Sequence, residues 1–289
     1  MYKEGEKMKV LLIPNFQKNN CEKVTFDVIN ILKEKNAEIY ALYECKQYIK
    51  SELVAFISPQ SIYKDFDFAI TIGGDGTIIE AANILLEREI PIIGVNLGTL
   101  GFLAGIETNE LNLIYDILCG EYSIDERTTL KVEIEHLNSK TTRFTAINDI
   151  VISKNAFSGI IDIDVECNGV ETAKYRADGI IFSTASGSTA YAMSAGGPIM
   201  HPDIKGIALT PICAHSLFAR TIILPESEQI TVKTNAESVK KRVFVVADGL
   251  NSVDITEGDI IKISKYNKNI KFIRINGKSF YSSINKKLM

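Results

Sequence analysis

The segment Gly73-Gly74-Asp75-Gly76-Thr77 combines residue types that could handle both a phosphate group and a proton. The run before it, 66–72, is short, apolar and β-branched, as expected of a buried strand. The run after it, 78–89, has apolar residues at helical spacing, and Thr77 with Glu80 forms a capping-box pair, so we expect a helix to begin at Thr77. Such a turn collects backbone N–H groups at the positive end of a helix dipole. The loop is therefore a candidate phosphate site.

Asp75 is unusual in such a loop because a carboxylate repels phosphate. The residue fits if a metal ion lies between the two groups, or if the carboxylate accepts a proton from a hydroxyl that attacks a phosphoryl group. An Asp-Gly pair also occurs in β-hairpin turns. The helical spacing that follows disfavours a hairpin, since a returning strand should alternate between apolar and polar residues.

Length and composition describe an ordinary globular chain. Its 289 residues are enough for two domains, with 46% hydrophobic and 24% charged residues. The net charge of −4 provides no general attraction to nucleic acid or to anionic membranes, so we expect neither as a partner. The charged first residues do not resemble a secretion signal, and no apolar run is long enough to span a bilayer. We therefore expect a cytoplasmic protein.

The five cysteines are dispersed and show no CxxC pairing. A disulfide framework or a zinc site would need clustered cysteines, so reduced thiols are expected.

The first part of the chain alternates strands and helices. Strands are expected at 9–14, 37–42, 66–72 and 91–96, and helices at 21–35 and from Thr77 onwards. This order indicates a doubly wound, Rossmann-like α/β domain with a parallel sheet. Ligands of such sheets collect at the carboxyl ends of the strands, where Asp75 and Asn96 fall. A helix over 108–119, with Gly120 beyond its end, is expected to close this domain at about residue 124.

From about residue 125 the pattern changes to alternation with a period of two, as in 130–135, 161–166 and 230–233. Asn168-Gly169 is a hairpin signal between two such runs. We therefore expect an all-β sandwich of antiparallel sheets over 125–269. Two strand-like runs within 260–275 have a pattern that leaves their sheet open.

Three further segments are candidate nucleotide contacts. Phe102, in the glycine-punctuated loop 96–103, either stacks on a base or joins the core. Asn148-Asp149 either binds a ribose diol and an adenine edge or forms a solvated turn. The run 175–191 places a cluster of Ser, Thr and Gly before a short helix, where hydroxyls can bind phosphate or ribose oxygens.

Several common enzyme classes lack their signatures. The chain has neither the GxxxxGK[ST] P-loop nor the GxGxxG dinucleotide fingerprint. Ser186 is not surrounded by a GxSxG elbow, and the chain has only 3 His, which disfavours covalent serine catalysis.

Taken together, these segments resemble the ATP–NAD kinase family. The loop 73–77 matches the family's first signature, Asn148-Asp149 its short Asn-Glu/Asp signature, and 178–202 its long glycine-rich signature. The segment 211–217 and Asp248-Gly249 agree as well. Ala185 stands where a proline is common, and Val246-Ala247-Asp248 replaces the usual Ser-Phe-Asp; neither departure affects the proposed chemistry.

The resemblance implies an N-terminal α/β domain and a C-terminal β-sandwich with the active site between them, and a chain end, about 270–289, that returns to the first domain. It implies phosphorylation of the 2′-hydroxyl of the adenosine ribose of NAD, giving NADP. The donor would be ATP or inorganic polyphosphate, with Mg²⁺ or Mn²⁺. Family members form homodimers or homotetramers in which neighbouring subunits contribute to the NAD site.

Under this resemblance Asp75 would be the general base, and the glycine amides would hold the triphosphate. Asn148 and Asp149 would bind the NAD ribose and adenine, and Arg176 would meet a phosphate. No residue is assigned to a metal. The residues that we assign to nucleotide binding are Gly73, Gly74, Gly76, Thr77, Phe102, Asn148, Asp149, Arg176, Asp178, Ser186, Thr189, Ala190, Tyr191 and Ser194.

Other functions share part of these features. A lipid kinase of the diacylglycerol or sphingosine type has the same loop but needs a membrane-facing apolar or basic surface, which the acidic composition does not offer. A phosphofructokinase relative also has a Gly-Gly-Asp-Gly loop, but no basic set for a sugar phosphate follows it here. A catalytically silent dinucleotide sensor would be free to lose Asp75, which this chain retains.

Overall fold

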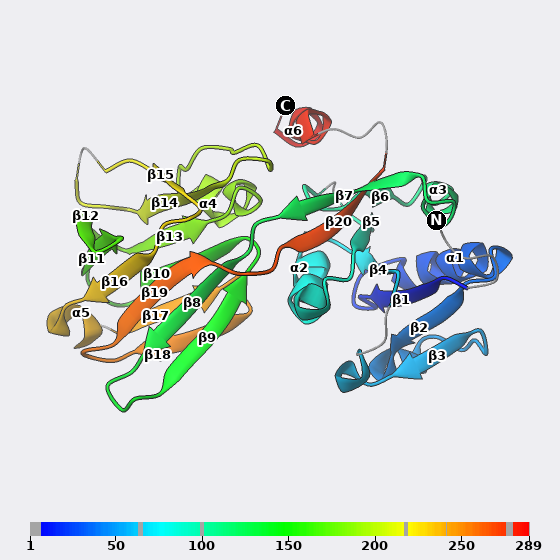
Figure 1. The fold of residues 1–289 in the computed structure, drawn as a ribbon, viewed down its shortest axis with the longest axis horizontal. Helices are drawn as coiled ribbons and strands as arrows, with labels where there is room; N and C mark the ends of the chain where they lie inside the picture. Colours follow the sequence, from blue (N-terminus) through cyan, green and yellow to red (C-terminus); the bar gives the residue numbers. More distant parts are fainter. Residues whose placement is uncertain are drawn as a thin grey trace. The chain divides into compact units, whose positions relative to one another are not determined.

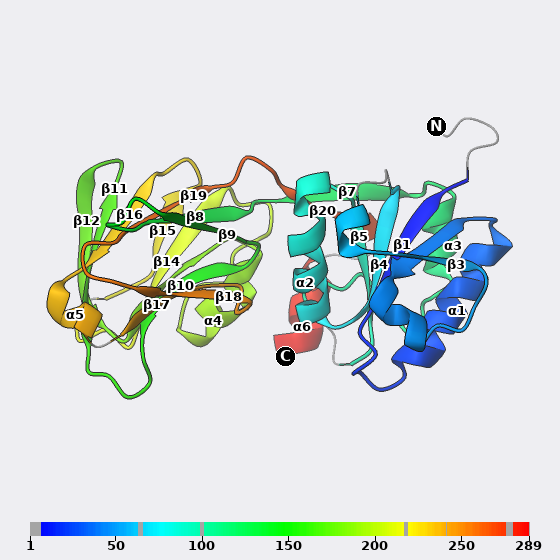
Figure 2. The ribbon, with the colours of Figure 1, turned by 90° about the horizontal axis from the view of Figure 1, so that it is seen from below.

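The computed structural model describes residues 7–62, 66–98, 101–216, 219–240, 242–275 and 280–288 (Figures 1 and 2). Its chain divides into two compact units: unit 1 is Met1–Glu126 with Ile270–Met289, and unit 2 is Arg127–Asn269. The charged first six residues, Thr99 and Leu100 of the second glycine loop, and Leu217 lie outside the described residues.

Unit 1 is built on a sheet of eight described strands in the order β3-β2-β1-β4-β5-β20-β7, with β6 beside β5. Neighbouring strands along β3-β2-β1-β4-β5-β20 pair in parallel, which confirms the expected α/β class. The strands are β1 (Lys9–Pro14), β2 (Glu38–Leu42), β3 (Val54–Ile57), β4 (Phe68–Gly73), β5 (Ile92–Asn96), β6 (Ile106–Glu107), β7 (Tyr122–Arg127) and β20 (Ile270–Ile275).

Helices cover both faces of this sheet because the chain winds in two directions from its centre. The crossover from β1 to β2 carries α1, and the crossover from β4 to β5 runs the other way and carries α2, so right-handed connections put them on opposite faces (Figure 1). The helices are α1 (Cys21–Glu34), α2 (Asp75–Leu85), α3 (Leu113–Leu118) and α6 (Phe280–Leu288), with 3₁₀ turns η1 (Tyr43–Gln47), η2 (Pro59–Ser61) and η3 (Leu86–Arg88).

Two helix boundaries differ from the sequence expectation. The helix α2 begins at Asp75 rather than Thr77, its N-cap residue is Gly74, and no side chain caps it, so the capping box does not form. Thr77 is instead buried and accepts a hydrogen bond from Asn15 Nδ2 (3.3 Å). The helix α3 is shorter than 108–119, but Gly120 beyond it has φ of +80°, the left-handed conformation expected of a C′ glycine.

The two C-terminal runs whose sheet the sequence left open belong to different units. The strand β19 (Ile260–Lys265) pairs with β8 and β16 in unit 2, whereas β20 lies between β5 and β7 in unit 1. The chain therefore returns to the first unit after completing the second.

Unit 2 consists of two antiparallel sheets, in the orders β15-β14-β13-β10-β17-β18 and β12-β11-β16-β19-β8-β9, as expected of a β-sandwich. Its further strands are β8 (Leu130–Glu135), β9 (Thr141–Ala146), β10 (Asp149–Lys154), β11 (Ile161–Cys167), β12 (Val170–Ala177), β13 (Gly179–Ser183), β14 (Gly206–Ile212), β15 (Ile222–Pro225), β16 (Ile230–Thr234), β17 (Val243–Ala247) and β18 (Asn251–Ile255). Short helices are η4 (Gly187–Thr189), α4 (Tyr191–Ser194) and α5 (Ala236–Lys240).

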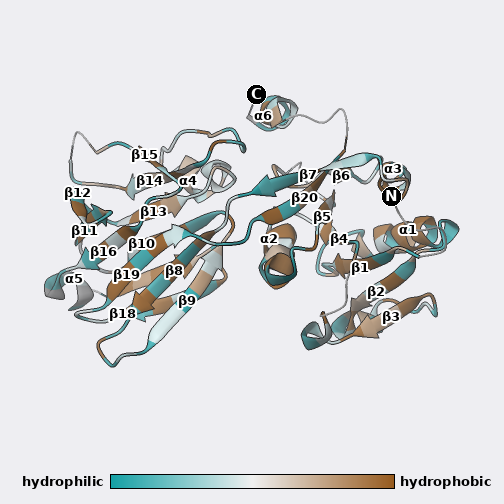
Figure 3. Cartoon of the chain, in the orientation of Figure 1, coloured by the Kyte–Doolittle hydropathy of each residue, from teal (hydrophilic) through white to brown (hydrophobic). Residues whose placement is uncertain are grey.

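The inner faces of these sheets follow directly from the alternating sequence. Along β8 the buried Leu130, Val132 and Ile134 alternate with half-buried charged residues, visible as brown and teal in Figure 3. The strand β13 is buried throughout because its outer face is covered as well, by Ala192 of α4 against Ile181. The hairpin predicted at Asn168-Gly169 is confirmed, since both residues have positive φ between β11 and β12.

All five cysteines are free thiols. Within the described ranges, no helix is both long enough and apolar enough to span a bilayer.

The return of the chain end from unit 2 to unit 1 gives the first prediction. Ile273 of β20 and Ile263 of β19 are both buried, and replacing either with alanine should lower the free energy of unfolding by about 2–5 kcal/mol. Hydrogen exchange should accelerate in β4 and β5 for Ile273→Ala, but in β8 and β16 for Ile263→Ala. The same exchange pattern in both variants would contradict the division of these strands between two units.

Candidate functional site

The glycine loop places Asp75 at the start of a helix and at the carboxyl end of a central parallel strand. Gly73 ends β4, Gly74 is extended, and Asp75 is the first residue of α2. A Cβ on Gly73 would lie 2.3 Å from Thr77 Oγ1, so the turn requires glycine there. Gly76 and Asp75 remain accessible at the helix start, where backbone N–H groups and the dipole favour an anion.

The carboxylate of Asp75 is held by the second glycine loop. The backbone N–H groups of Phe102 and Leu103 donate to its Oδ2 (2.9 Å) and Oδ1 (3.3 Å). A Cβ on Gly101 would lie 1.9 Å from Oδ1, so the carboxylate packs directly on the Gly101 backbone. The two loops also leave the sheet together, since Leu97 N–H donates to Gly73 O (2.8 Å). The orientation of Asp75 is therefore fixed before any ligand binds.

Phe102 is half-buried rather than part of the core. The ammonium of Lys287 in α6 lies 4.3 Å from the centre of its ring and 3.9 Å from Asp75 Oδ2. Lys287 thus lies close to both the Phe102 ring and the Asp75 carboxylate.

A divalent metal ion fits this loop as a partner of phosphate rather than as a resident ion. The part of the chain that the structure describes has no group of three or more His, Cys, Asp or Glu side chains that could hold a metal. Mg²⁺ typically takes one or two protein carboxylates together with phosphate oxygens and water. Asp75 meets this requirement, because its side chain is 27% exposed and each oxygen keeps a lone pair beyond its amide bond.

Unit 2 contains a pocket of about 430 Å³, a size typical of small-molecule sites. Four of the predicted residues line it: Asn148, Asp149, Ala190 and Tyr191. Val151 and Val246 supply apolar surface, and Asp248 and Gly249 line the pocket as well. The short signature and the start of the α4 helix are therefore brought together, as the resemblance implies.

The Asn148-Asp149 corner is positioned by Asp248, a residue to which the sequence analysis gave no role. Three successive backbone N–H groups, of Ile147, Asn148 and Asp149, donate to the Asp248 carboxylate at 2.7, 2.8 and 3.0 Å. Asp248 has φ of 50° in the turn between β17 and β18, a conformation that Asp tolerates better than most residues. Its sequence signal was the Asp248-Gly249 match, which carries no information about what the carboxylate binds.

Residues of the long glycine-rich signature, 178–202, also support the Asn148-Asp149 corner. Thr184 Oγ1 donates to Ile147 O (2.7 Å), and Thr184 N–H donates to Asn148 O (2.9 Å). A Cβ on Gly187 would lie 2.0 Å from Asn148 O, so only glycine permits this approach. With the backbone held, Asn148 Oδ1 is buried and has no hydrogen-bond partner among the described residues.

Asp149 is 5% exposed, and its environment raises its pKa from 3.8 to about 7. Burial is the main cause and the nearby Asp248 carboxylate adds to it, whereas the backbone N–H of Tyr191 lowers the pKa by donating to Asp149. The pocket thus holds two carboxyl groups in different surroundings. Asp248 is satisfied by three amides, and Asp149 keeps a proton close to neutral pH.

The remaining predicted residues do not line this pocket. Arg176 is exposed and pairs with Asp162 (3.2 Å), and Asp178 pairs with Lys154 (3.4 Å). Ser186 Oγ accepts a hydrogen bond from Arg127 Nη1 (3.1 Å), Thr189 Oγ1 donates to Ser186 O, and Ser194 is exposed at the end of α4. Their nucleotide contacts remain predictions, as does the meeting of the Asp75 loop with the unit 2 pocket.

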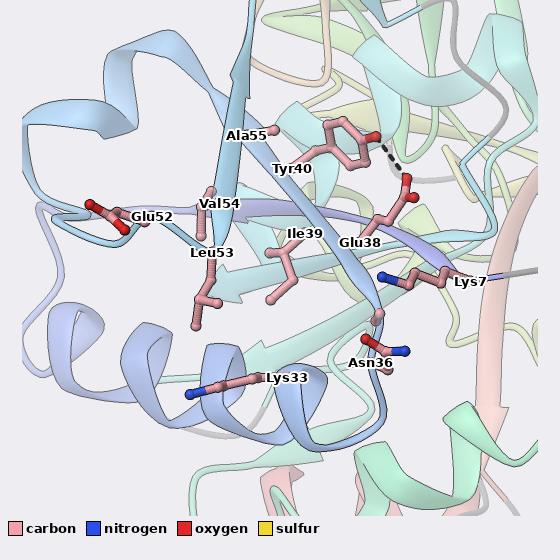
Figure 4. A pocket seen from close by; sticks show the side chains of 11 residues that line it. Lys7, Lys33, Asn36, Glu38, Ile39, Tyr40, Glu52, Leu53, Val54 and Ala55 are labelled. Carbon is pink, nitrogen blue, oxygen red and sulfur yellow. Dashed lines mark hydrogen bonds between the residues drawn. The ribbon is translucent and has the colours of Figure 1, made fainter.

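A hollow of about 360 Å³ in unit 1 is a weaker candidate (Figure 4). Glu38 and Val54, which line it, begin β2 and β3, so it lies at the amino ends of the strands, away from the edge where α/β sheets bind ligands. Tyr40 donates to Glu38 Oε2 (2.9 Å) within it, which satisfies that carboxylate locally.

The close approach of Asp75 to the Gly101 backbone gives the second prediction. Gly101→Ala should push the carboxylate off the Phe102 and Leu103 amides and lower the free energy of unfolding by about 1–3 kcal/mol. Gly98→Ala is the matched control, because a Cβ there has no atom within 4 Å. Chemical denaturation should separate the two variants, and equal stabilities would show that Asp75 is not packed on Gly101.

The pKa of Asp149 gives the third prediction. Between pH of about 4 and about 7 the residue ionises in the unfolded chain while the folded protein retains its proton, so folding stability falls as the pH rises. Relative to Asp149→Asn, the unsubstituted protein should lose up to about 1.4 kcal/mol per pH unit across this window. Denaturation curves at several pH values test this. Parallel stability profiles would contradict the raised pKa.

Comparisons with known proteins find similarity over both the α/β part and the β-sandwich part of the chain. The sequence models of the ATP-NAD kinase N-terminal domain and C-terminal domain match residues 10–122 and 147–275. The NAD kinase of Natranaerobius thermophilus is 35% identical over 278 residues, 96% of each chain, and that of Lachnoclostridium phytofermentans is 36% identical over 279 residues, 94% of this chain and 96% of the other.

Two solved structures share the fold over nearly the whole chain. Yeast NADH kinase, solved with NADH, has a TM-score of 0.89 at 25% identity and covers 99% of this chain, which in turn covers 88% of it. The NAD kinase of Archaeoglobus fulgidus, solved with ATP, has a TM-score of 0.73 at 26% identity, with 96% and 98% covered. With both domain models matched and both glycine-loop and pocket elements in place, the chain belongs to the ATP-NAD kinase family.

Proposed function

We propose that this protein transfers a terminal phosphoryl group to the 2′-hydroxyl of the adenosine ribose of NAD, producing NADP. The observation that carries the proposal is the Asp75 carboxylate, fixed by two backbone amides at the first residue of α2. A donor phosphate at the helix start and a hydroxyl beside the carboxylate are what phosphoryl transfer to an alcohol requires.

Asp75 acts as the general base. Its oxygens retain lone pairs toward solvent, so one of them accepts the ribose hydroxyl proton. Meanwhile the hydroxyl oxygen bonds to the terminal phosphorus, and the bond between that phosphorus and the bridging oxygen of the donor breaks, so that the shortened donor leaves. The clamp by Phe102 and Leu103 limits rotation of the carboxylate, which keeps the accepting oxygen in one place during the reaction. The amides that follow Gly73 and Gly74 orient the phosphate chain, and the α2 dipole favours its charge.

The unit 2 pocket binds the nucleoside part of NAD. Asn148 lines this pocket, and its side-chain amide can both donate to and accept from an adenine edge or a ribose hydroxyl. Asp149 can donate when protonated and accept when ionised. Tyr191 is 47% exposed at the pocket and offers a ring face for stacking.

The phosphoryl donor is ATP or polyphosphate, bound with Mg²⁺ or Mn²⁺. The metal ion, when bound with the phosphates, neutralises their charge and helps hold them in line. Asp75 is the protein carboxylate that would face it. We further expect a homodimer or homotetramer in the cytoplasm, because the family resemblance implies subunits that share the NAD site.

The fourth prediction tests the base. Asp75→Asn should reduce turnover at least about a hundredfold while NAD affinity changes little, because the amide cannot accept the proton but occupies the same space. The control is Glu80→Gln, an exposed acid on the same helix. Unchanged turnover in Asp75→Asn would remove this residue from the mechanism.

The activity itself is tested by incubating the purified protein with NAD, Mg²⁺ and either ATP or polyphosphate, followed by an NADP-specific coupled assay. NADP formed with either donor supports the kinase and identifies the donor. Tight NAD binding without NADP from either donor would instead favour a dinucleotide sensor.

A further inference from the structure

The C-terminal helix α6 brings two neighbouring lysines to unit 1 in different environments. Lys287 Nζ lies 3.9 Å from Asp75 Oδ2 and 4.3 Å from the centre of the Phe102 ring. Lys286 Nζ lies 3.5 Å from Glu107 Oε1 and is 66% exposed. Consecutive helical residues point about 100° apart, so one lysine reaches the glycine loop and the other does not.

The loop needs a cation that its own sequence does not provide. Between Gly73 and Leu103 there are four acidic residues, Asp75, Glu80, Glu87 and Glu89, and one basic residue, Arg88. A helix N-terminus supplies only about half a unit of positive charge, against about four negative charges on a triphosphate. Phosphate binding beside Asp75 therefore calls for positive charge from outside this segment, and Lys287 supplies one from the end of the chain.

The ammonium of Lys287 is held loosely. A separation of 3.9 Å is within ion-pair range but too long for a hydrogen bond. Among the described residues Lys287 Nζ makes no hydrogen bond, so its three N–H groups remain available. The ring of Phe102 attracts the ammonium without consuming these donors. The ammonium can therefore turn toward a phosphate without losing a hydrogen bond.

We propose that Lys287 is a phosphate-binding residue of the donor site, and that its ammonium shifts from Asp75 to the phosphate chain when the donor binds. The shift leaves the Asp75 carboxylate free to accept the hydroxyl proton once the donor is in place. Binding of the phosphate donor and separation of Lys287 from Asp75 then occur together. The proposal rests on the proposed kinase function and adds a specific residue to its donor site.

The test compares binding of Mg·ATP and of NAD to four forms of the full chain by calorimetry: unsubstituted, Lys287→Ala, Lys287→Arg and Lys286→Ala. Losing a charge-assisted hydrogen bond should weaken Mg·ATP binding about tenfold to a hundredfold in Lys287→Ala, with NAD affinity within about twofold. Lys287→Arg keeps the charge and should retain most of the affinity. Lys286→Ala removes an equal charge from the same helix and should match the unsubstituted protein.

The outcomes separate the two proposals. Unsubstituted protein that binds NAD but not Mg·ATP, and forms no NADP, contradicts the kinase function with this donor. If that protein is active, unchanged or tighter Mg·ATP binding in Lys287→Ala overturns the assignment of Lys287. A weakening shared equally by Lys286→Ala, or by NAD, also overturns it, because a general effect of helix charge or folding would then explain the loss. Thermal melting of each variant confirms that it is folded.

Discussion

A carboxylate at the first residue of a glycine-led helix is the constraint around which unit 1 is arranged. Negative charge is stabilised there by the α2 dipole, and two backbone amides of residues 102 and 103 fix its direction. The fit is close enough that the residue beneath the carboxylate has to be glycine. Two loops at the ends of adjacent strands β4 and β5 are thus needed to orient a single side chain, and Gly101 of the second loop leaves the space that this side chain occupies.

In unit 2 the carboxylate of one acid, Asp248, positions the backbone that carries another, Asp149. The Asp248 carboxylate accepts hydrogen bonds from three backbone amides and so holds the corner at 147–149. Its charge in turn makes ionisation of the buried Asp149 less favourable. Asp248 therefore fixes the position of Asp149 and adds to the effect of burial on its protonation. A pocket that must bind a ribose or an adenine edge gains from this, since a neutral carboxyl can donate as well as accept.

Most of the fold could be predicted from the sequence because alternating runs and continuous apolar runs are both easy to recognise in it. Alternation placed β8, β11 and β16, and continuous apolar runs placed β1, β4 and β5, each within two residues. The start of α2 was wrong because Thr77 turns inward to Asn15, a tertiary contact that no local pattern reveals. The sheets of β19 and β20 could not be assigned either, since both are short runs of mainly apolar residues with similar patterns, and only packing distinguishes the two units.

The site residues also divide into those that a local pattern reveals and those that depend on tertiary contacts. Asp75, Asn148 and Tyr191 sit in local motifs, so their spacing is enough to find them. Asp248 and Lys287 act across about a hundred residues or more of sequence, and their partners depend on how distant segments return. The return of β20 between β5 and β7 is what makes α6 part of unit 1. A cation for the glycine loop can come from α6 only because the chain leaves the sandwich to complete the first sheet. The return of β20 to the first sheet therefore determines both the order of its strands and the presence of Lys287 beside Asp75.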